Sequence, residues 1–137
     1  MLRSACLLVL VSMSARAMQC DCVDIGVQRL THVSDIVFRG TVVEFRGSGD
    51  DRIVIFDVSR VWKGRVTKRF EMLAIETPCI GFVPRSLRVG NELLVFASRR
   101  KKMYLQPPNV YFSQHCGTRE VKAVSDLRVL GDGREAN

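Results

Sequence analysis

Residues 36–45 read IVFRGTVVEF, and this stretch decides the fold. Ile36, Phe38 and Val42 recur at even spacing, so they share one face of a predicted strand. Val43 places an apolar side chain on the opposite face, so the buried face changes near the glycine of this run. Such a change predicts a bulge or a coil, the device by which one long strand serves both halves of a barrel.

Four further strands are predicted downstream. They are residues 52–62, a strand through Phe70, Met72 and Ala74, residues 92–97 and residues 103–105. In the first of these, Val54, Phe56 and Val58 recur at every second position and face inward. The stretch 92–97 reads ELLVFA and is apolar on both faces, which predicts a central strand.

Two helices flank the predicted strands. One spans residues 24–33, with Asp24 as its cap. The other opens at Thr118, carries apolar residues at positions 121, 124 and 127, and ends at Gly131. The polar tail of residues 132–137 is predicted to be disordered.

These elements predict a mainly β fold, a five-stranded barrel of the oligonucleotide/oligosaccharide-binding (OB) kind with a short N-terminal helix and a C-terminal helix. A β-sandwich is the alternative that the strand pattern leaves open. The length suits a single domain over residues 18–131.

The N-terminus has the features of a cleaved secretory signal peptide, residues 1–17. Arg3 precedes an apolar run, and Ala15 and Ala17 stand where a signal peptidase reads small residues. The run is far shorter than the roughly 20 residues of a membrane span. We therefore expect a secreted or periplasmic protein. Cleavage removes two arginines and no acid, which lowers the formal net charge from +7 to +5; this charge suits an acidic partner, and equally a soluble exported domain.

Four cysteines remain after cleavage: Cys20, Cys22, Cys79 and Cys116. An even number in an exported chain indicates two disulfides. A zinc site is the alternative. Zinc sites with four thiols normally have two pairs of cysteines that are close in sequence, whereas here only Cys20 and Cys22 are close. We expect no metal and no cofactor of the protein's own. His32 and His115 stand alone and are expected in surface or loop positions.

Several motifs occur in a set order along the mature chain. They are Cys20-x-Cys22, SDIVFRGTV at 34–42, VWKG at 61–64, Cys79, LLVFA at 93–97 and CGT at 116–118. This set resembles the netrin-like domain of the tissue inhibitors of metalloproteinases, in the small one-domain form found in bacteria. The resemblance extends from Cys20 to about Leu130.

The resemblance implies an OB-type barrel with the N-terminal segment joined to it by the bridges Cys20–Cys79 and Cys22–Cys116. Spacing alone leaves both long-range pairings open. In the chain-entropy model each bridge would contribute about 4 kcal/mol. The resemblance also implies that Cys20, Asp21 and Cys22 contact a protease, because in these inhibitors the amino nitrogen and carbonyl oxygen of the first cysteine chelate the catalytic zinc.

The sequence departs from the family pattern at two places. The best cleavage site leaves Met18 and Gln19 ahead of Cys20, and cleavage after Gln19 is the alternative. Asp21 stands where the inhibitors carry a small residue, and a desolvated carboxylate there is costly. Cys20 and Cys22 have a structural alternative role, which is only to tie the first segment to the barrel.

A second function follows from the basic stretch Arg99, Arg100, Lys101 and Lys102, which could be joined by Lys63, Arg65, Lys68 and Arg69. It predicts an envelope or extracellular protein that binds anionic glycans or polymers. We expect that the protein is not an enzyme, since its sequence contains no C-x-x-C pair, nucleophile elbow or paired carboxylates. Few aromatic residues and export argue against nucleic-acid binding.

Overall fold

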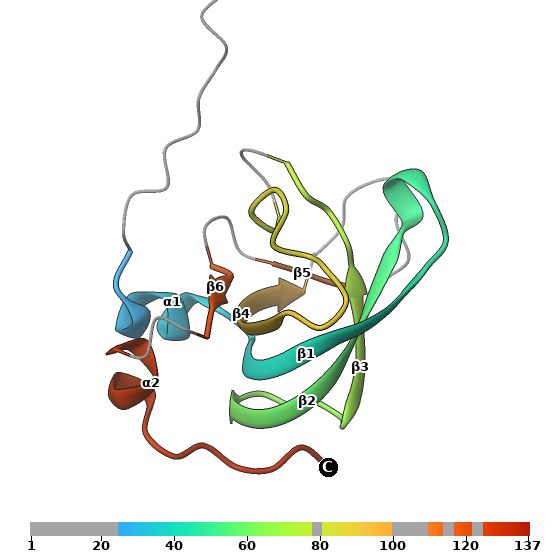
Figure 1. Ribbon diagram of the computed structural model, residues 1–137. Coiled ribbons are helices and arrows are strands. Elements are labelled where there is room, and N and C mark those ends of the chain that lie inside the picture. Colours follow the sequence, from blue (N-terminus) through green and yellow to red (C-terminus); the bar gives the residue numbers. More distant parts are fainter. Residues whose placement is uncertain (1–24, 78–80, 100–109, 114–116, 122–124) are drawn as a thin grey trace, which may run out of the picture.

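The computed structural model describes residues 25–77, 81–99, 110–113, 117–121 and 125–137. It is mainly β, with a curled antiparallel half-barrel sheet of five strands and two short helices (Figure 1). The strands lie in the order β3-β2-β1-β4-β5, and a short β6 pairs with β4. The elements are α1 (Val27–Val33), β1 (Ile36–Arg46), the 3-10 turn η1 (Gly49–Asp51), β2 (Ile53–Lys63), β3 (Arg69–Leu73), β4 (Glu92–Arg99), β5 (Tyr111–Ser113), β6 (Arg119–Glu120) and α2 (Ser125–Leu130).

Strand β1 contains the bulge that the sequence predicts. In its pairing with β2, Val42 lies opposite Phe56 and Glu44 lies opposite Ile55, so Val43 is the extra residue. Val43 is exposed, and the phase shift lets Val42 and Phe45 both pack on the interior although they are three positions apart. The register also shifts between Arg39 and Gly40. The bulges let this strand pair with β2 and β4 while it bends around the core.

The main core fills the inside of the half-barrel. Phe38 and Phe56 are fully buried and meet edge to face, with ring centroids 5.4 Å apart. Phe38 also meets Phe70 of β3, and Phe70 lies 5.4 Å from Tyr111 of β5. The two end strands of the sheet therefore approach each other through aromatic contacts, which is what curls the sheet into a half-barrel.

A second core lies on the outer face of the sheet, under the two helices. Val27 and Leu30 of α1 pack with Leu94 and Phe96 of β4, and Leu127 of α2 packs against the same cluster. Figure 1 shows α1 and α2 side by side on this face. Strand β4 thus buries one set of side chains in the half-barrel and the other under the helices, which confirms that it is central.

Helix α1 begins at Val27, after Gly26, and no side chain caps it. The predicted cap, Asp24, lies outside the described residues. At the other end, the Lys63 ammonium group donates hydrogen bonds to the carbonyls of Thr31 and His32, at 2.8 and 3.0 Å. A cation at a helix C-terminus satisfies free carbonyls and complements the helix dipole. Lys63 of the VWKG motif therefore fastens α1 to the end of β2.

The segment after residue 117 differs from its prediction. A helix from Thr118 is wrong, because residues 119 and 120 form β6 against Leu94 and Leu93, and α2 begins only at Ser125. The hydroxyl of Thr118 is buried and lies 2.6 Å from that of Ser113, so it is committed to β5 and does not cap a helix. The strand predicted at 103–105 lies outside the described residues, and β5 is found after it.

The tail of residues 132–137, for which the sequence predicts disorder, is held against β2. Val61 and Arg134 exchange two backbone hydrogen bonds, and Lys68 N–H donates to the carbonyl of Asn137 at 2.9 Å. Upstream, the Trp62 indole donates to the carbonyl of Gly131 at 2.8 Å. Val61 and Trp62 belong to the part of β2 that extends beyond β3, and Lys68 directly precedes β3, so the tail occupies an otherwise open strand edge.

Candidate functional site

The predicted protease-contacting residues, Cys20, Asp21 and Cys22, lie outside the described residues, as do Cys79 and Cys116. The structure nevertheless describes a contact between two residues that lie close in sequence to Cys22 and Cys116, the cysteines of one predicted bridge. The Arg119 guanidinium donates to the carbonyl of Ile25 at 3.1 Å. These positions lie three residues after Cys116 and three residues after Cys22, so β6 holds the start of the described chain at the helix-covered side of the sheet.

Of the predicted basic patch, Arg99 is described, whereas Arg100, Lys101 and Lys102 lie outside the described residues. The Arg99 guanidinium donates to the Tyr111 hydroxyl at 2.9 Å and lies over that ring, 5.3 Å from its centroid. Its backbone N–H donates to the Asp35 carboxylate. Arg99 is therefore held against β5 and the start of β1.

The cations of the 63–69 segment are largely engaged within the fold. Lys68 forms an ion pair with Asp57 at 2.9 Å, and Arg69 forms one with Glu44. Lys63 is bound to the end of α1, and Arg65 is exposed. Two of these four cations are matched by carboxylates, so the positive charge of Lys63 and Arg65 is what the segment adds to this surface.

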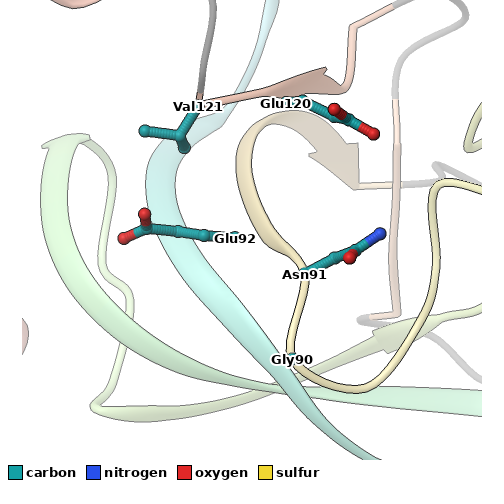
Figure 2. Close-up of a pocket in the computed structure, with 5 residues that line it drawn as sticks. All are labelled: Gly90, Asn91, Glu92, Glu120 and Val121. Atoms are coloured by element: carbon teal, nitrogen blue, oxygen red, sulfur yellow. The ribbon is translucent and has the colours of Figure 1, made fainter.

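A pocket of about 370 Å³ lies beside the start of β4, lined by Gly90, Asn91, Glu92, Glu120 and Val121 (Figure 2). Its two carboxylates do not converge, because Glu92 and Glu120 point in opposite directions. Glu92 accepts two hydrogen bonds from Arg39, at 2.6 and 2.9 Å. This contact raises the pKa of the Arg39 guanidinium, and burial opposes part of the rise. The carboxylate of Glu92 is thus committed to a structural ion pair.

His32 is exposed in the last turn of α1, and His115 lies outside the described residues. In the described ranges no three side chains of histidine, cysteine, aspartate or glutamate gather in a way that could hold a metal ion. No helix in this part of the chain has the length and apolar character needed to cross a membrane.

Sequence reasoning missed one surface feature, the loop between residues 81 and 91. Arg85 there has φ 71°, in the left-handed region that favours glycine. The only signal in the sequence is Pro84, which is typical of the second position of a turn.

No protein-family model matches the chain, and a search of curated proteins finds no match.

Proposed function

We propose that this chain is an exported, non-catalytic protein-binding module with a netrin-like OB barrel, and that its partner is a zinc metalloendopeptidase contacted by the segment Cys20–Cys22. The observation that carries the proposal is the strand order β3-β2-β1-β4-β5, with a bulged central β1 and the end strands in contact through Phe70 and Tyr111. That order, with the end strands β3 and β5 in contact, suits a partly open five-stranded barrel. It agrees with the fold implied by the motifs from Cys20 to Leu130.

The contact between Arg119 and Ile25 supports the pairing Cys22–Cys116. Three residues span at most roughly 10 Å, so the chain length allows Cys22 and Cys116 to meet beside this contact. Disulfides join Cα atoms about 5.5–6 Å apart. A bridge here would fix the segment that precedes α1 to the barrel, and a rigid segment loses little freedom when it binds.

Inhibition by zinc chelation sets a strict condition on the mature N-terminus. A neutral α-amine has a lone pair that can fill an open position on zinc. An amide nitrogen shares its lone pair with the peptide carbonyl and cannot do so. The inhibitory form is therefore the chain that begins at Cys20, and a chain that begins at Met18 lacks the chelating group.

Two preparations of the oxidised protein test the proposal, one beginning at Cys20 and one at Met18. We expect the first to inhibit members of a zinc endopeptidase panel. The extra Met18 and Gln19 should weaken inhibition by about 100-fold or more, which is about 2.7 kcal/mol. Inhibition constants measured with peptide substrates give the comparison.

Carbamylation of the Cys20 α-amine provides the matched control, because it delocalises the nitrogen lone pair into a urea group without adding residues. The modified protein should lose inhibition to the same extent. The proposal is wrong if the chain that begins at Cys20 inhibits no protease of the panel, or if both forms inhibit equally.

A further inference from the structure

The loop from Gly81 to Asn91 is firmly anchored at its base. Phe82 and Leu87 are buried in the main core. The carboxylate of Glu76 accepts the Leu87 N–H at 3.1 Å, and the side-chain amide of Asn91 donates to the carbonyl of Ser86 at 3.0 Å. The backbone of the loop is therefore held in a defined conformation by its buried residues and these hydrogen bonds.

Two tight turns form the outer part of this loop. In the first, Ser86 N–H donates to the carbonyl of Val83 at 3.0 Å, and Arg85 occupies the third position with φ 71°. A type II turn requires a positive φ at this position and normally places glycine or asparagine there. An arginine in this conformation is strained, and such strain is often found at functional sites. Its guanidinium is exposed to solvent.

The sequence around this turn carries only positive charge. Residues 77–91 contain Arg85 and Arg88 and no acidic residue. The flanking carboxylates are engaged elsewhere, Glu76 with the Leu87 N–H and Glu92 with Arg39. Neither arginine side chain has a hydrogen-bond or ion-pair partner among the described residues. Both guanidinium groups are thus open to an external anion.

Exposed apolar side chains accompany these arginines. Val83 is 41% exposed and Val89 is 64% exposed, and they flank the stretch that holds Arg85 and Arg88. A polyanionic glycan presents mainly charged groups and hydroxyls, so it would leave these apolar side chains unmatched. A peptide with a carboxylate beside an apolar side chain would match both features, since a guanidinium binds carboxylates through two parallel hydrogen bonds.

We infer that Val83, Arg85, Arg88 and Val89 form a preorganised recognition surface for an acidic–apolar peptide segment of a partner protein. All four residues belong to the described loop, and none of them belongs to the segment Cys20–Cys22. Its rigid base keeps the ordering cost of binding low.

Short immobilised peptides with a glutamate next to a leucine or valine serve as the probe. Matched peptides carry glutamine in place of the glutamate, or serine in place of the apolar residue. We expect the acidic–apolar set to bind about tenfold more tightly than either matched set, as charge-assisted hydrogen bonds and apolar contacts would give. Heparin is tested in parallel.

The decisive variant is Arg85→Asn, because asparagine accepts the left-handed conformation and lacks the charge. It should weaken binding of the acidic–apolar peptides by about tenfold, while Tm stays unchanged or rises by about 2 °C. Arg65→Asn removes an exposed loop arginine elsewhere and should leave binding unchanged. A loss of Tm in Arg85→Asn, unchanged peptide binding, absence of acidic–apolar preference, or binding to heparin alone would overturn the inference.

Discussion

Phe56→Ala is expected to lower the free energy of unfolding by about 4 kcal/mol. The side chain is fully buried, meets Phe38 edge to face, and lies 6.1 Å from the ring of Phe82. Its removal leaves a cavity in the main core of the half-barrel, beside the rings of Phe38 and Phe82. Urea denaturation followed by circular dichroism measures the change.

Phe45→Ala is the matched control, because it makes the same change at a half-buried position near the end of β1. There the Arg52 guanidinium lies over the ring, 3.9 Å from its centroid, and the side chain is only partly buried against the main core. A loss of about 1.5 kcal/mol is expected. Equal effects at the two positions would contradict the placement of Phe56 at the centre of the core.

Gly64→Ala is expected to cost about 3–4 kcal/mol. Gly64 has φ 75°, and a Cβ there would lie 2.5 Å from Cγ2 of Ile36 and 2.6 Å from the carbonyl oxygen of Asp35. The left-handed conformation costs an alanine roughly 1–2 kcal/mol, and overpacking against backbone adds about 1–3 kcal/mol. Thermal and urea unfolding of the variant give the value.

Gly90→Ala separates these two contributions. Gly90 has φ 91° and open space where a Cβ would stand, so only the conformational cost applies. We expect a loss of about 1–2 kcal/mol. If Gly64→Ala costs no more than Gly90→Ala, then the close approach of the VWKG turn to the start of β1 is not a constraint on the fold.

The long strands could be predicted from the sequence because their pattern is local and repeated. In β2, Val54, Phe56 and Val58 face the core as the alternation predicts, and β4 is buried on both faces. The bulge in β1 could be predicted because a single inserted residue, Val43, shifts the apolar phase. Each of these signals comes from neighbouring residues in one strand.

The short elements depend on contacts with distant residues and could not be predicted. Strand β6 exists because Leu93 and Leu94 offer a free ladder edge, and the hydroxyl of Thr118 is used by Ser113. The last residues are ordered by Val61 and Lys68, which lie more than sixty positions earlier. A pattern of neighbouring residues in the sequence does not indicate which distant residues a segment will contact.

The candidate sites show the same division. The Cys20–Cys22 segment could be proposed as a protease-contacting site because its C-x-C motif is visible in the sequence. Its role stays a prediction. The surface around Arg85 could not be predicted from the sequence, because a proline followed by an arginine also suits a turn with negative φ. Contacts from Glu76 and Asn91 hold the loop that places Arg85 in the left-handed region.

The disulfide map of the purified protein tests most directly whether the N-terminal segment is fixed to the barrel as a binding element. Proteolysis without reduction, followed by mass spectrometry and N-terminal sequencing, gives the bridges and the first residue together. We predict peptides that join Cys20 to Cys79 and Cys22 to Cys116. Free thiols, a bridge between Cys20 and Cys22, or the crossed pairing Cys20–Cys116 would contradict it.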